Sequence, residues 1–137
     1  MNIVIAIAAV LVSAFNAFGF YKAGSFKAKA TKEVLLGAGM GWVANIPLGL
    51  VRLIAWLEIL GAVGSVAGPI GAYATGFTSS LWVGVAAAAG LALTMLVAFI
   101  MHVVRGEAKY TWKMNLTMLA TSIIAAVLQA LVVLPIF

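Results

Sequence analysis

The stretch that decides the fold is RLIAWLEILGAVGSVAG, which runs from Arg52 to Gly68. Most of its residues are apolar, as in a helix that crosses a bilayer, yet Arg52 and Glu58 lie inside it. A charged side chain near the bilayer centre costs at least about 2.5–3.5 kcal/mol on insertion scales. Because two charges in one membrane helix need polar partners from the rest of the protein, we expect this helix to be the centre of a small bundle.

The composition indicates an integral membrane protein with a single domain over residues 1–137. Of these residues 66% are hydrophobic and 8% are charged, against roughly 25% charged in a soluble domain. The absence of cysteine excludes disulfides, thiolate catalysis, iron–sulfur ligation and cysteine-type zinc sites. A single histidine cannot form a histidine-rich metal site or a two-histidine haem site. We attribute the net charge of +5 to membrane topology and expect no nucleic-acid partner.

Four apolar segments, each of roughly the 20 residues that a bilayer requires, predict an all-α bundle of four transmembrane helices. The first segment is expected to be a retained helix, because no basic region precedes it and no small-residue cleavage site ends it. Pro47 suits the first turn of the second helix, and Gly68-Pro69 is expected to end that helix. The predicted helices cover residues 2–21, 46–68, 81–104 and 114–134.

Two polar connectors, residues 22–44 and 105–113, hold seven of the eight basic residues. An up-down-up-down bundle places both connectors on one side, and the positive-inside rule makes that side cytoplasmic. We therefore expect both termini on the non-cytoplasmic side of the plasma (inner) membrane. The glycine-rich part of the first connector, residues 37–41, lacks the spacing and the βαβ context of a dinucleotide site. It is expected to be a flexible or re-entrant segment.

Polar side chains are expected to gather in the cytoplasmic half of the bundle. At 1.5 Å per residue Arg52 lies about 9 Å and Glu58 about 18 Å from the start of their helix, so Glu58 is expected near the midplane. The two are roughly 120° apart around the helix and are not expected to pair within it. Trp56 is expected to be buried beside them. The predicted pocket or polar network consists of Arg52, Glu58, His102, Trp56, Asn16, Thr94 and Asn115.

This polar group has more than one interpretation. It is either a buried network that fixes helix packing or the lining of a cavity for a quinone, a lipid or a similar amphipathic molecule, and a proton or ion path is a third alternative. Small residues let a second helix approach closely. Some of them, on the second and third helices, are also candidates for docking against another transmembrane helix. The residues predicted to pack helices are Gly61, Gly64, Ser65, Gly68, Gly84 and Gly90.

Three elements of the sequence resemble the DoxX-like membrane proteins, and the resemblance extends over nearly the whole chain. They are Gly19-Phe20-Tyr21-Lys22, the helix with RLI at Arg52 and EILGA at Glu58, and GLALTMLVAFIMHVVRGE from residue 90 to 107. The resemblance implies a four-helix bundle in which Arg52, Glu58 and His102 are the signature polar residues. The chain departs from a typical member at Ala55, where glycine is common, and in its long glycine-rich first connector.

The resemblance also implies a range of functions. Some DoxX-like proteins are subunits of a thiosulfate:quinone oxidoreductase, some belong to membrane complexes with redox or sulfur-transfer enzymes, and a distant animal branch assists receptor assembly. We expect a non-catalytic accessory or assembly subunit of a redox complex of the respiratory type, with a pocket that contacts a quinone or a lipid and with no covalently bound cofactor. Other membrane subunits, lipids or a second copy are the expected partners. The alternatives are a quinone-linked oxidoreductase subunit and a small proton-coupled transporter.

Overall fold

A computed structural model of the chain describes residues 3–134. Within this range the structure is all-α, which confirms the predicted fold class. Four of its helices are long and apolar enough to cross a membrane. In chain order the elements are α1 (Ile3–Lys29), α2 (Lys32–Gly37), the short 3₁₀ helix η1 (Gly41–Asn45), α3 (Leu48–Thr75), α4 (Ser80–Val104) and α5 (Ala108–Val133).

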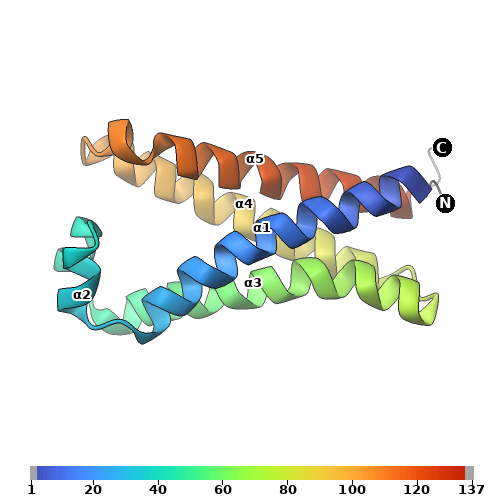
Figure 1. Ribbon diagram of the computed structural model, residues 1–137, viewed down its shortest axis with the longest axis horizontal. Coiled ribbons are helices and arrows are strands. Elements are labelled where there is room, and N and C mark those ends of the chain that lie inside the picture. The colour runs from blue at the N-terminus through green and yellow to red at the C-terminus, as the bar shows by residue number, and fades with distance from the viewer. Residues whose placement is uncertain (1–2, 135–137) are drawn as a thin grey trace.

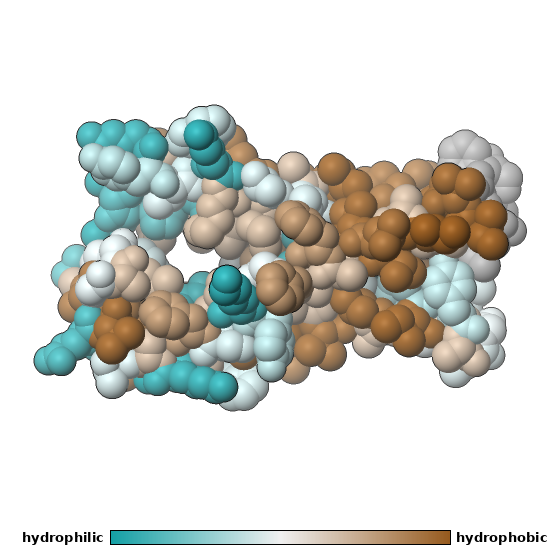
Figure 2. Space-filling view, viewed as in Figure 1, coloured by the Kyte–Doolittle hydropathy of each residue, from teal (hydrophilic) through white to brown (hydrophobic). Residues whose placement is uncertain are grey.

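The long helices form a ring in the order α1, α3, α4, α5, and each contacts the next. The beginning of α1 and the end of α5 lie at the same end of the bundle (Figure 1). We call the opposite end, which holds residues 30–47 and the α4–α5 turn, the polar end. There the α1–α3 pair diverges from the α4–α5 pair (Figure 1). Hydrophilic residues gather at the polar end, and the rest of the visible surface is mainly hydrophobic (Figure 2).

Two of the long helices extend further at the polar end than the apolar segments indicate. α1 continues past Tyr21 to Lys29, and α5 begins at Ala108, before its apolar run. Alanine and lysine are good helix formers, and a lysine stem can cover apolar surface while its charge reaches water. Hydropathy therefore marks where the bilayer span ends, whereas the helices themselves continue into the polar region. Residues 22–44 are consequently not an open connector, because they contain the last turns of α1 as well as α2 and η1.

α3 also continues through Pro69, where the sequence was expected to end it, and this expectation was wrong. Proline has no backbone N–H, so the carbonyl of Ser65 loses its intrahelical donor. In the structure that carbonyl accepts a hydrogen bond of 2.9 Å from Nε2 of Gln129 on α5. A side chain of α5, the helix across the ring from α3, thus replaces the missing donor. α3 ends instead at Thr75, where Gly76 adopts the left-handed conformation of a helix C-cap (φ 71°).

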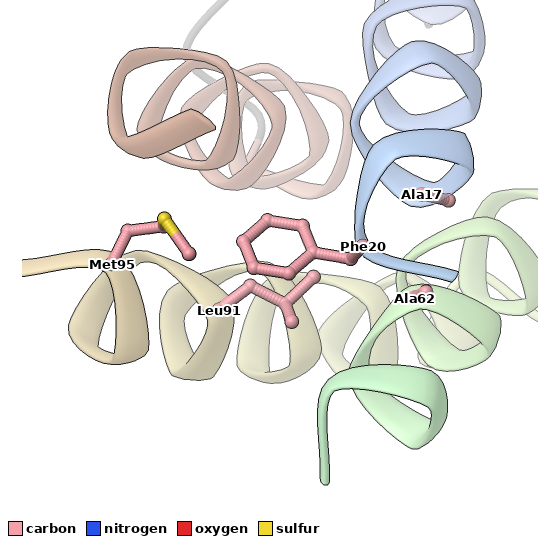
Figure 3. Close-up of a cluster of buried hydrophobic side chains, with 5 residues drawn as sticks. All are labelled: Ala17, Phe20, Ala62, Leu91 and Met95. Carbon is pink, nitrogen blue, oxygen red and sulfur yellow. The ribbon is translucent and has the colours of Figure 1, made fainter. Parts of the chain in front are cut away.

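The apolar core between the four helices is small. Figure 3 shows the ring of Phe20 from α1 beside Leu91 and Met95 of α4, with Ala17 and Ala62 completing the cluster. Because the remaining interior positions are mostly alanine, glycine or serine, the helix backbones approach closely. Phe20 lies about two turns before Lys27 along α1, and Ala62 lies about one turn after Glu58 along α3, so the cluster is adjacent to the charged residues of these helices.

Small residues hold α3 against α4. A methyl group on Gly68 would lie 2.6 Å from the backbone nitrogen of Gly84, so neither helix has room for a side chain there. Gly61 and Gly64 also face α4, against Leu91 and Ala87. Gly68 and Gly84 are therefore buried inside the monomer. They do not face lipid, whereas the sequence had suggested small residues on these two helices as docking positions for another helix. Gly90 differs, since nothing lies within 4 Å of the position where its side chain would begin.

Candidate functional site

A buried ion pair joins α1 to α3 at the polar end. Nζ of Lys27 lies 2.7 Å from Oε1 of Glu58, and the two side chains are only 10% and 3% exposed. One turn earlier on α1, Gly24 allows the close approach, because a methyl group there would lie 2.8 Å from the carbonyl oxygen of Ala55. The pair places the charge of Glu58 opposite the last turns of α1. The expectation that Glu58 lies near the bilayer midplane stays a prediction.

Lys27 was missed because its helix was predicted to end at Tyr21. The signal was nevertheless present in the sequence. The buried positions of α1 recur every three or four residues and continue with the same spacing past the apolar run to Lys27: Ser13, Asn16, Ala17, Phe20, Gly24 and Lys27. Such spacing marks one face of a helix. Extending this face would have predicted an inward-pointing lysine as the partner of Glu58.

Arg52 lies beside this pair without joining it. Its Nη1 donates a hydrogen bond of 2.7 Å to the carbonyl oxygen of Lys27. This carbonyl belongs to the last turn of α1, where backbone acceptors lack intrahelical donors. Arg52 thus closes the end of α1. As expected from their angular separation, Arg52 and Glu58 do not form an ion pair with each other.

A second polar group forms at the α4–α5 turn. Nδ1 of His102 lies 2.8 Å from Oε2 of Glu107, and Nε of Arg105 donates to Oε1 of Glu107 at 3.0 Å. These two hydrogen bonds, that of His102 first, lower the pKa of the Glu107 carboxyl below its ordinary value. Gly41 of η1 packs against this group, since a methyl group there would lie 3.2 Å from Nη2 of Arg105.

Residues 30–47 form a cap across the polar end, and the glycine-rich residues 37–41, which were expected to be a flexible or re-entrant segment, join α2 to η1 within it. Leu35 of α2 and Val43 of η1 are fully buried against Val51 of α3. The side chain of Thr31 caps α2 by accepting a hydrogen bond from the backbone N–H of Val34. The cap is anchored to α3 at one side, and Gly41 reaches the α4–α5 turn at the other. Between the two helix pairs the surface is hollowed at this end (Figure 2).

A third polar group lies deeper in the bundle. Oδ1 of Asn16 accepts hydrogen bonds from Thr121 at 2.8 Å and from Ser122 at 3.0 Å. Gln129 donates through Nε2 to Ser13 at 2.8 Å as well as to the Ser65 carbonyl. These bonds tie α5 to α1 and α3. The residues that the sequence spaces by seven along α5 form its buried polar face, namely Asn115, Ser122 and Gln129.

Some buried polar atoms have no hydrogen-bond partner within residues 3–134, and two of them lie at the polar end. They are Oε2 of Glu58 and Nδ2 of Asn115. Gly19 of α1 faces Met118 of α5, and Asn115 lies about one turn closer to the polar end than Met118. Gly24 of α1 faces Glu58 of α3, so Glu58 and Asn115 lie at similar levels along the bundle. A hydrogen-bond acceptor on α3 and a donor on α5 therefore both lack partners at this level, on the polar-end side of the apolar cluster of Figure 3. The other two such atoms are Nδ2 of Asn16 and Oε1 of Gln129.

Two of the predicted pocket residues lie elsewhere. Trp56 is 56% exposed on the outer surface, because it is two positions from Glu58 and so points to the opposite side of α3. Thr94 bonds to the carbonyl of Gly90 within its own helix. It lines an outer groove of about 370 Å³ between α3 and α4. Neither residue belongs to the interior of the polar end.

Together these features define a multi-pass membrane protein, a four-helix bundle whose charged residues gather at one end. The DoxX-like family model matches residues 7–127, and the chain belongs to this family. The matched segment contains the polar residues described above except Gln129, which lies two positions beyond it. Among curated proteins and solved structures, none matches the chain.

Proposed function

We propose that the chain is a non-catalytic accessory or assembly subunit of a membrane redox complex, and that its polar end binds the head group of a quinone or a lipid. The observation that carries the proposal is the buried pair of Lys27 and Glu58, in which Oε2 of Glu58 has no partner among the described residues. Leaving a buried polar atom unpaired costs about 1–3 kcal/mol. Such a cost is repaid when a ligand or a water molecule supplies the missing hydrogen bond.

The unpaired atoms match the chemistry of an amphipathic head group. Nδ2 of Asn115 can donate to a quinone or ester carbonyl, and Oε2 of Glu58 can accept from a hydroquinone or glycerol hydroxyl. Mostly apolar pockets with a few polar groups of this kind are typical of small-molecule sites. The hollow between the two helix pairs at the polar end supports entry from that end (Figure 2).

The residue types available support the accessory role. The sequence has no cysteine and only one histidine, so the chain offers few ligands for a redox centre. Electron transfer would therefore use a cofactor on a partner subunit, with this chain holding or presenting the quinone. The alternative function is that of a quinone-linked oxidoreductase subunit, in which a quinone in the same pocket takes part in the electron-transfer reaction.

Asn115→Leu tests the pocket, because leucine has the same branched side-chain shape and lacks the unpaired amide. The tagged chain is purified from its native membranes in mild detergent, and bound quinones and lipids are measured by mass spectrometry. We expect the variant to retain roughly three- to tenfold less ligand, the equivalent of one net hydrogen bond, with its thermal stability unchanged or raised. Thr117→Leu, at an exposed position on the same helix, is the matched control.

The same purification tests the accessory role through the proteins that accompany the chain. We expect membrane subunits of a redox complex to co-purify with the wild type and with both variants. A ligand content equal in Asn115→Leu and the wild type, together with a loss of stability in the variant, would assign Asn115 to helix packing and contradict the pocket. A wild type that carries no partner subunit in native lipid discs would contradict the accessory role.

A further inference from the structure

Arg52 is a guanidinium for which the described chain provides no carboxylate. The sequence has only three acidic residues, all of them glutamates within residues 3–134. Glu58 pairs with Lys27, and Glu107 pairs with His102 and Arg105. No ion pair within the described range joins Arg52 to any glutamate. Its hydrogen bond to the Lys27 carbonyl uses Nη1 and leaves the other donors of the guanidinium for a further acceptor.

The position of Arg52 along α3 corresponds to the boundary between lipid and water. It lies in the second turn of the helix, beside the end of α1, and is half-buried. One turn further into the span, on the same side of α3, Trp56 is 56% exposed, and the neighbouring Leu53 is 54% exposed. An exposed tryptophan next to an arginine is typical of the head-group level of a bilayer. Arg52 therefore lies where lipid phosphates lie.

The charges around Arg52 favour an anion. The end of α1 and the beginning of α2 carry four lysines and one glutamate, and α3 adds Arg52 and Glu58. Juxtamembrane basic residues of this kind attract anionic lipids electrostatically. Since Lys27 and Glu58 neutralise each other, the remaining charge is positive. The exposed members of this basic group are Lys22 and Lys29.

We infer that Arg52 binds the phosphate group of an anionic phospholipid at the joint between α1 and α3. A guanidinium presents a planar fork that matches two phosphate oxygens, and such charge-assisted bonds are about twice as strong as neutral ones. The exposed faces of Leu53 and Trp56 would contact the acyl chains below the phosphate. This site faces the surrounding lipid and does not depend on the interior pocket proposed above.

The test compares the thermal unfolding midpoint of delipidated protein in detergent before and after addition of phosphatidylglycerol or phosphatidylcholine. Using the increment within each variant removes any effect of the substitution on intrinsic stability. We expect phosphatidylglycerol to raise the midpoint of the wild type more than phosphatidylcholine does. Arg52→Gln should retain less than half of that increment, and Arg52→Lys should be intermediate because it keeps the charge and loses the fork. Lys113→Gln, which removes an exposed charge on α5, should behave like the wild type.

Several outcomes would overturn the assignment. Equal increments in Arg52→Gln and the wild type would show that the arginine does not bind the lipid, and an equal loss in Lys113→Gln would indicate diffuse attraction by net charge. If inorganic phosphate alone produced the wild-type increment, the ligand would be the free anion. Should Arg52→Gln fail to fold, Arg52→Lys decides the question, because an undiminished increment in that variant would contradict bidentate binding.

Discussion

Gln129 contacts all three of the other long helices. Its Nε2 bonds to Ser13 of α1 and to the Ser65 carbonyl of α3, and its Oε1 lies against Gly84 of α4. The need for this residue comes from Pro69, which deprives the Ser65 carbonyl of its backbone donor. A single amide on α5 therefore compensates for a proline on α3.

Replacing Gln129 by leucine should lower the free energy of unfolding by about 1–3 kcal/mol, because the Ser65 carbonyl and the Ser13 hydroxyl then remain buried without this partner. Pro69→Ala in the same chain should recover part of the loss, since alanine restores the backbone donor to Ser65. Chemical unfolding in detergent of the two single variants and the double variant measures this coupling. Simple additivity of the two substitutions would contradict the role assigned to Gln129.

The contribution of the α4–α5 turn to the stability of the fold depends on pH through Glu107. Hydrogen bonds from His102 and Arg105 hold the pKa of Glu107 below its ordinary value of 4.5. A carboxyl whose pKa is lower in the folded state stabilises that state above the unfolded pKa, and the contribution is lost as the pH falls through the folded value. Thermal midpoints should therefore fall between pH 5 and pH 3 more steeply in the wild type than in Glu107→Gln. Parallel profiles would show that the turn does not contribute.

At the scale of the elements, the packing of α3 on α4 depends on glycine at two facing positions. Gly68→Ala would place a methyl group 2.6 Å from the backbone of Gly84, so the helices must separate. We expect a loss of about 1–3 kcal/mol, measured by unfolding in detergent. Gly90→Ala is the matched control on α4, where nothing lies within 4 Å and alanine is the better helix former by about 1 kcal/mol. A variant at Gly68 as stable as the one at Gly90 would exclude close packing at this crossing.

At the scale of the whole molecule, the charge distribution predicts the orientation in the membrane. Seven of the eight basic residues lie in residues 22–44 and 105–113, at the polar end, and the positive-inside rule makes this end cytoplasmic. The chain has no cysteine, so single cysteines report without background. Thr78→Cys, exposed at the opposite end, should react with an impermeant reagent on intact cells, and Ala38→Cys in the cap should react only after lysis. The reverse pattern would invert the topology.

The sequence by itself determined the number of long helices and their apolar spans, because hydropathy and spacing are local properties of the chain. It also indicated that Arg52 and Glu58 do not pair within their helix. The ends of the helices were harder to predict from the sequence, because α1 and α5 continue as helices beyond the apolar run. Helix formation depends on propensity and packing as well as on hydropathy.

Only the tertiary structure decided the partners of the polar groups. The pairing of Glu58 with Lys27 requires α1 to continue past Tyr21 and to approach α3 at Gly24. The passage of α3 through Pro69 requires a donor from Gln129, which is 64 positions away from Ser65. The ordered cap requires Leu35 and Val43 to be buried on Val51. These contacts join segments far apart in the chain, and a local pattern carries no information on the distance between them in space.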